Sequence, residues 1–240
     1  MTSAGPGRPR NQQPSRPGAT AREEILDAAA ELFTTQGFAN TSTRSIADAV
    51  GIWQSSLYHH FKTKDDILKD LLESTVAASL SFAKAVSGVS SDSASAEVVL
   101  HALALYDGTQ LCSSRWNLGI LYHLPEARGG QFDRFLASRR ELRAIYGTLG
   151  VRASASPTDV AGNPGDLVFR LVESLVNLRA DGLVLPSSPL EAADAGLIIC
   201  GRGKELQVIR RQSALIIESA ERLEDFQGSA HPGDAVGARD

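Results

Sequence analysis

The chain has 240 residues, 42% of them hydrophobic, and a formal net charge of −4. It has no run of 18 apolar residues, and its first residues are rich in Pro, Gly, Arg and Gln. These features exclude a membrane-spanning helix and a secretory signal and predict a cytoplasmic protein. The two cysteines, Cys112 and Cys200, lie far apart and outside any metal-ligand spacing, so neither a disulfide framework nor a zinc site is expected.

Positive charge is concentrated at the start of the chain. Residues 1–64 carry seven basic and five acidic residues, a net of +2, which leaves −6 for the rest. This asymmetry places a nucleic-acid surface at the N-terminal end.

Residues 1–21 have no acidic residue and low complexity, which predicts a disordered basic arm. Within it, Gly7-Arg8-Pro9-Arg10 resembles the core of an AT-hook, an element that fits a narrow minor groove. A tail with no role in DNA binding is the alternative.

The first predicted helix ends at Gly37 and carries an apolar stripe of Ile25, Ala29, Leu32 and Phe33. Residues 43–61 then predict two short amphipathic helices joined at Gly51, where a glycine with positive φ ends the first helix and turns the chain. We expect Thr43 to be the N-cap of this pair. This pattern is typical of a helix-turn-helix. The apolar face of the pair consists of Ile46, Ala47, Val50, Leu57 and Phe61, and the opposite face of the second helix of Gln54, Ser55, Tyr58 and His59.

Residues 22–70 resemble the DNA-binding domain of the TetR family of one-component transcriptional regulators. The run from Gly51 to Lys64 carries this resemblance, together with Thr43 before it. The resemblance implies DNA contacts, mostly to phosphates, by Thr43, Gln54, Ser55, Tyr58, His60 and Lys64. Arg44, Trp53 and His59 complete our set of candidate DNA-binding residues, and Gln54 is the best candidate for contacting a base edge.

Trp53 departs from the family pattern, which often has Ser or another small polar cap at this position. An indole cannot accept the capping hydrogen bond. Trp53 either presses on a thymine methyl group or a sugar, or covers the edge of the motif's core. The second interpretation is favoured because large aromatic side chains are more often buried. The sequence Thr63-Lys64-Asp65-Asp66 predicts a capping box, with Lys64 at a helix N-terminus where phosphate binds.

The rest of the chain predicts helices separated by Ser-, Gly- and Pro-containing breaks. The expected helices span 65–86, 96–111, 115–124, 132–149, 166–180 and 190–226, the last with a break at 201–203. The helix over 166–180 is apolar on most of its circumference, which favours burial or a shared interface. With the last region, where Leu206, Ile209, Ile216, Ala220 and Leu223 follow helical spacing, it is the best candidate for a homodimer interface built as a four-helix bundle.

No catalytic motif, cofactor fingerprint or metal-ligand pattern occurs beyond Asp65, so an enzyme is not expected. Polar and aromatic residues instead occur on the helices with which the TetR family lines an effector cavity. The candidates are Asp107, Trp116, Asn117, Tyr122, His123, Arg143, Tyr146 and Glu173. Stacking on Trp116 and Tyr122 would suit an aromatic or phenolic effector. Arg139, Arg143 and Tyr146 are expected on one face. For each candidate, a surface or core role is the alternative; Arg143 could pair with a surface acid.

These observations predict an all-α protein. We expect a disordered arm over 1–21, a three-helix DNA-binding domain over 22–66, a helical effector-binding and dimerisation domain over 67–227, and a disordered tail over 228–240. The expected function is a homodimeric repressor that binds operator DNA and is released by a small-molecule effector, without cofactor, metal or membrane partner. A redox switch using Cys112 and Cys200, and an activator of the same fold, are the alternatives.

Overall fold

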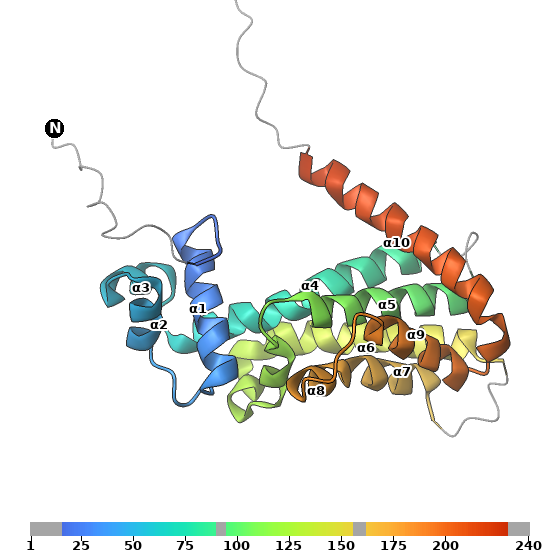
Figure 1. The fold of residues 1–240 in the computed structure, drawn as a ribbon, viewed down its shortest axis with the longest axis horizontal. Coiled ribbons are helices and arrows are strands. Elements are labelled where there is room, and N and C mark those ends of the chain that lie inside the picture. Colours follow the sequence, from blue (N-terminus) through green and yellow to red (C-terminus); the bar gives the residue numbers. More distant parts are fainter. Residues whose placement is uncertain (1–15, 90–94, 156–161, 230–240) are drawn as a thin grey trace, which may run out of the picture. The chain divides into compact units, whose positions relative to one another are not determined.

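The computed structural model describes residues 16–89, 95–155 and 162–229, and this part of the chain is helical without a strand (Figure 1). The all-α fold expected from the sequence is confirmed. Most of the expected disordered arm, with its Gly7–Arg10 segment, and of the expected disordered tail lies outside the described residues. Within them, Arg16 forms hydrogen bonds, Thr20 caps α1, and residues 228–229 belong to α10. Contacts divide the chain into two compact units. Unit 1 runs to Thr75 and includes residues 114–136, and unit 2 comprises residues 76–113 and everything from Ala137 onward.

Unit 1 contains the predicted helix-turn-helix. Its helices are α1 (Ala21–Thr35), α2 (Thr43–Val50), α3 (Gln54–His60) and the first part of α4 (Lys64–Val89). Residues 114–136 add three short 3-10 helices, η1 (Leu118–His123), η2 (Pro125–Arg128) and η3 (Gly130–Phe132). The short helix expected over 115–124 is present as the 3-10 helix η1 over Leu118–His123. Pro125, which has no N–H to donate, begins the second of these turns.

α1 begins at a capping box in which Thr20 accepts a hydrogen bond from the Glu23 N–H and the Glu23 carboxylate accepts from the Thr20 N–H. Its apolar stripe packs into the core of unit 1. The fully buried side chains of this core include Ile25, Phe33, Ile46, Leu57, Ile67, Leu68 and Leu72. Residues of all four helices therefore share one core, which fixes the orientation of α2 and α3.

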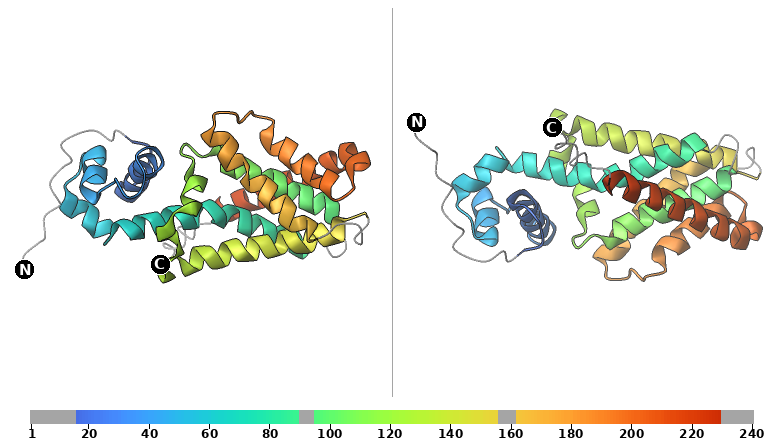
Figure 2. Two further views of the ribbon diagram at one scale, coloured as in Figure 1. Left: turned by 90° about the horizontal axis from the view of Figure 1, so that it is seen from below. Right: turned by 90° about the horizontal axis from the view of Figure 1, so that it is seen from above.

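Unit 2 is a helical bundle around α5 (Ala96–Ser113), which contacts α7, α8, α9 and α10 (Figure 2). The surrounding helices are the second part of α4, α6 (Asp133–Ala153), α7 (Pro164–Glu173), α8 (Leu175–Ala180), α9 (Ser188–Ile199), the short η4 (Gly203–Glu205) and α10 (Leu206–Ser229).

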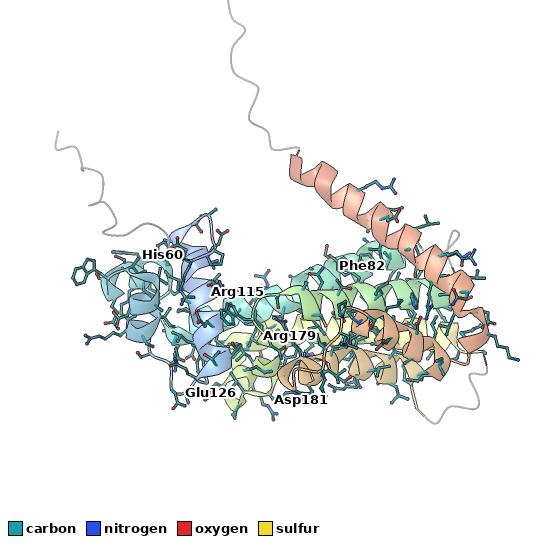
Figure 3. All side chains as sticks on the ribbon, in the orientation of Figure 1. His60, Phe82, Arg115, Glu126, Arg179 and Asp181 are labelled. Atoms are coloured by element: carbon teal, nitrogen blue, oxygen red, sulfur yellow. The ribbon has the colours of Figure 1, made fainter. Side chains whose placement is uncertain are left out.

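Phe82 of α4, labelled in Figure 3, stacks on Tyr106 of α5 with ring centroids 4.2 Å apart. α6 and α7 cross closely: a Cβ atom on Gly165 would lie 1.9 Å from the Tyr146 carbonyl oxygen, so this crossing requires glycine.

The helix expected over 166–180 is present as α7 and α8, which are separated at Ser174. The Ser174 hydroxyl bonds to the Leu171 carbonyl oxygen, and its N–H bonds to the carbonyl oxygens of Arg170 and Leu171. Part of the α10 stripe that was expected to form a dimer interface packs within the protomer. Ile209 is buried with Val98 and Leu197, and Leu206 and Ile216 pack against this cluster. Ala220 is half-buried, and the side chain of Leu223 lies outside the described residues.

Candidate nucleic-acid interface

α2 and α3 are joined by the tight turn that the sequence predicts. Gly51 has a φ of 74°, the left-handed conformation, and its N–H bonds to the Asp48 carbonyl oxygen. The N-cap of α2 is Ser42 and not Thr43, because the Ser42 hydroxyl accepts a hydrogen bond from the Ser45 N–H at 3.0 Å. Thr43 is the first residue of the helix, so its hydroxyl can bond elsewhere.

The predicted DNA-binding side chains lie on the side of α2 and α3 that is not buried. Arg44, Gln54, Ser55, Tyr58, His59 and His60 are exposed, and Thr43 is half-buried. His60, at the end of α3, is labelled in Figure 3. Leu57 is fully buried, which fixes the rotation of α3 about its axis. The side of α3 that carries Leu57 therefore faces the core, and the candidate DNA-binding residues lie away from it.

Three of these side chains form a hydrogen-bonded network across the two helices. The Gln54 side-chain Nε2 donates to Thr43 Oγ1 at 3.0 Å and lies 3.5 Å from the Tyr58 hydroxyl. The Thr43 and Tyr58 hydroxyl oxygens are 3.1 Å apart. The family resemblance implies that Thr43 and Tyr58 contact DNA. In this structure both also lie within hydrogen-bonding distance of Gln54, the candidate for contacting a base.

Trp53 does not cover the motif's core. Its side chain is 82% exposed, and it is the N-cap of α3 without a side-chain capping bond. The packing interpretation is therefore wrong, because an indole that is 82% exposed covers little of the motif's core. An exposed indole at the start of a recognition helix is free to contact DNA.

Lys64 extends back toward the loop before α2. Its ammonium group donates to the carbonyl oxygens of Phe38 and Thr41, at 2.7 and 2.8 Å, and lies 4.1 Å from the centroid of the Phe38 ring. The predicted capping box is present, because Thr63 and Asp66 bond to each other's N–H groups at 2.9 and 3.1 Å. Lys64 therefore stabilises the loop that leads into α2, a role that the sequence pattern did not indicate.

The eight effector candidates do not form a single group. Trp116, Asn117, Tyr122 and His123 belong to unit 1, and Asp107, Arg143, Tyr146 and Glu173 to unit 2. The Trp116 indole N–H donates to Asp27 Oδ1 at 2.9 Å, and the Tyr122 ring lies 5.5 Å from that of Phe135. His123 is exposed, and Asn117 is half-buried.

Within unit 2, one pair of candidates is buried together. The Tyr146 hydroxyl donates to Asp107 Oδ2 at 3.0 Å, and both side chains are buried. Burial raises the pKa of Asp107 to about 6, although the hydroxyls of Ser79 and Tyr146 oppose this shift. Burial and the nearby Asp107 carboxyl raise the pKa of Tyr146 well above its ordinary value. A buried carboxyl with a pKa near neutrality is typical of a functional site.

The other two candidates form ion pairs. Arg143 is exposed and pairs with Asp166 through two hydrogen bonds of 2.9 and 2.8 Å, as the surface alternative predicted. Glu173 binds Arg139 and Arg170. The three residues expected on one face of α6 therefore bind three different acids, which are Glu173 and Asp166 of α7 and Asp107 of α5. A groove of about 590 Å³ beside it is lined by Arg140, Arg143, Arg152, Asn163 and Asp166.

Two polar clusters have no counterpart in the sequence-based predictions. Asp27 of α1 binds Arg16, Arg115 and Trp116, and no local pattern marks it. His101 is fully buried in α5, with its ring nitrogens 2.8 Å from Ser213 Oγ and 3.1 Å from Asp194 Oδ1. Burial lowers the pKa of His101, although Asp194 opposes this shift. A histidine among the apolar residues of 98–105 could have been noticed in the sequence.

Neither cysteine has the features of a redox sensor. Both are free thiols, Cys200 is buried and Cys112 half-buried, and burial raises the pKa of each. A raised pKa favours the neutral thiol, which is the unreactive form. In the part of the chain that the structure describes, no helix has the length and hydropathy needed to cross a bilayer.

The chain is similar to a known protein family and to solved structures. The sequence model described as "Bacterial regulatory proteins, tetR family" matches residues 25–71. The crystal structure of Mycobacterium smegmatis AmtR has a TM-score of 0.76 and 48% identity, covering 84% of this chain and 96% of that one. The structure of the ketosteroid transcriptional regulator KstR2 of Mycobacterium tuberculosis has a TM-score of 0.61 at 21% identity, covering 79% and 97% of the two chains, which shows a shared fold.

A curated relative is similar over a short part of the chain. The HTH-type transcriptional repressor KstR2 of Mycolicibacterium smegmatis is 46% identical over 59 residues, which is 25% of this chain and 28% of the repressor. The match therefore spans little more than a quarter of that relative's length.

Proposed function

The chain belongs to the tetR family of bacterial regulatory proteins, and on this premise we propose that it is a homodimeric repressor released from its operator by a small effector. Members of this family are DNA-binding transcriptional regulators and not enzymes, so DNA-binding regulation is its general function. Repression is favoured by the names of its curated relatives, several of which are called transcriptional repressors.

The observation that carries the proposal is the exposed polar face of α3, held by the buried Leu57. A helix with small and hydrogen-bonding side chains on its outer face fits the major groove, where base edges offer donors and acceptors. Phosphate contacts by Arg44 and the residues around it position the helix, and base contacts specify the sequence.

Dimerisation is supported by apolar side chains left exposed on three helices of unit 2. These are Leu167 of α7, Ile198 of α9, and Val208 and Leu215 of α10. Exposed apolar side chains on neighbouring elements mark interaction surfaces. A two-fold dimer recognises two half-sites of a palindrome, which adds specificity that one seven-residue helix cannot supply.

Effector binding is supported by the buried Asp107–Tyr146 pair, with polar atoms among the apolar side chains of unit 2. Sites for small molecules combine mostly apolar walls with a few polar groups that orient the ligand. We propose an aromatic or phenolic effector. It can release DNA only by binding more tightly to the conformation with lower operator affinity.

Selection of bound duplexes from a random pool tests this proposal. We expect a palindromic site with half-sites about one helical turn, or a multiple of it, apart. Binding to the selected site should be released by at least one member of an aromatic and phenolic panel, measured by titration. Recovery of unrelated sequences with only salt-sensitive affinity would contradict specific operator binding.

A further inference from the structure

The Gln54 amide is hydrogen-bonded across α2 and α3, with Nε2 facing two hydroxyl groups. Nε2 is 3.0 Å from Thr43 Oγ1 and 3.5 Å from the Tyr58 hydroxyl. Because those two oxygens are only 3.1 Å apart, both lie in the same direction from Nε2, and one N–H serves both. A free glutamine side chain loses rotamer entropy when it binds a base, and this network removes part of that loss beforehand.

The network leaves two groups of the amide available to DNA, the Oε1 acceptor and the second N–H donor. Base edges in the major groove differ in what they offer such a pair. Adenine presents an N6 donor beside the N7 acceptor, guanine presents two acceptors, cytosine one donor, and thymine an acceptor beside a methyl group. Only adenine offers both a donor for the Oε1 acceptor and an acceptor for the free N–H donor of the Gln54 amide.

We propose that Gln54 specifies an adenine in each half-site and that Thr43 and Tyr58 are positioning residues, which set this preference through Gln54. With the amide turned over, Oε1 would face the hydroxyls and both N–H groups would face DNA. That arrangement matches the two acceptors of guanine. The orientation of the amide therefore decides between two purines. This inference rests on the proposed operator binding by α3.

The test uses the full-length protein and its selected operator, with every base pair of a half-site replaced in turn. We expect one position with an A·T preference of roughly ten- to a hundredfold, the range of a bidentate contact. A purine base lacking the N6 amino group at this position should lose most of that preference. Gln54→Ala should abolish the preference there and leave the other positions unchanged.

Thr43→Val and Tyr58→Phe distinguish positioning from phosphate contact. We expect both to weaken the adenine preference at the Gln54 position severalfold more than they weaken binding to random DNA. Thr35→Val is the matched control, since its hydroxyl bonds only to the Glu31 carbonyl oxygen of its own helix. Thermal unfolding of each variant establishes that the fold is retained.

Three results would overturn the inference. They are a guanine preference at the Gln54 position, an adenine preference that survives Gln54→Ala, and equal weakening of all sequences by Thr43→Val and Tyr58→Phe. Each of them presupposes a specific operator, so each leaves the proposed function standing. If no specific site is selected at all, the proposed function fails and this inference fails with it.

Discussion

At the scale of single residues, the buried carboxyl group of Asp107 makes the stability of the protein depend on pH. Asp107 is 4% exposed, and burial raises its pKa from 3.8 to about 6. Its ionised form therefore opposes folding at neutral pH, and protonation removes this effect as the pH falls through about 6. The free energy of unfolding should therefore rise as the pH falls from about 6 to 3.8, because the folded state binds the proton more tightly than the unfolded state does.

Asp107→Asn should therefore stabilise the protein at neutral pH by up to about 3 kcal/mol, since the amide keeps the acceptor for Tyr146 without the buried charge. The gain should diminish below the folded pKa of about 6 and vanish below the unfolded value of 3.8. Urea unfolding of both proteins across this pH range measures it. A difference in stability that does not change with pH would contradict the assignment.

Lys64 joins the N-terminus of α4 to the loop before α2 through two carbonyl oxygens. Lys64→Ala should lower the free energy of unfolding by about 1 to 3 kcal/mol without DNA, because hydrogen bonds to a charged donor are lost. Lys62→Ala is the control, since Lys62 bonds only to the Tyr58 carbonyl oxygen of the preceding turn. If both variants unfold like the wild type and differ only in DNA affinity, Lys64 acts solely as a phosphate contact.

At the scale of elements, a carboxylate on α1 joins three segments of unit 1. Asp27 Oδ2 accepts from Arg16 at 3.0 Å and from Arg115 at 3.4 Å, while Oδ1 accepts from the Trp116 indole. Arg16 also bonds to the Ala49 carbonyl oxygen near the end of α2. Asp27 thus connects α1 to the segment that follows α5 and, through Arg16, to the helix-turn-helix.

Asp27→Asn should lower the stability of the protein by about 1 to 3 kcal/mol, since an amide cannot accept from three donors as a carboxylate does. Differential scanning calorimetry compares it with Asp48→Asn, whose exposed side chain lies 4.0 Å from Arg44. We expect the second variant to have the wild-type melting temperature. Equal melting temperatures for all three proteins would show that the Asp27 contacts contribute nothing.

The elements also show what the sequence could predict. The helix-turn-helix follows from local signals, because Gly51 and the spacing from Ile46 to Phe61 specify a turn and a shared core. The effector candidates depend on which helices pack together. Tyr146 is buried against Asp107 while Arg143 is exposed beside Asp166, although the two residues are three positions apart on α6. Likewise, helical spacing on α10 could not distinguish residues of the protomer core from those of an interface.

At the scale of the whole molecule, the proposed dimer can be disrupted without changing the DNA-binding helices. Leu215 of α10 is 61% exposed, so Leu215→Arg should leave the protomer folded and weaken self-association. Operator affinity should fall by roughly a hundredfold or more, because the two half-sites are then bound independently. Sedimentation equilibrium measures the assembly, and Thr148→Arg on α6 controls for the added charge. A Leu215→Arg protein that stays dimeric would place the interface elsewhere.

The central claim is that α2 and α3 bind one DNA sequence specifically. Fluorescence anisotropy of the purified protein on the DNA upstream of its own gene, with random DNA as competitor and salt varied, tests it most directly. We predict tight binding that persists against competitor and is lost in Gln54→Ala. The contradicting result is binding that random competitor DNA removes and that depends only on salt. It would have to be found both on this DNA and on sites selected from a random pool.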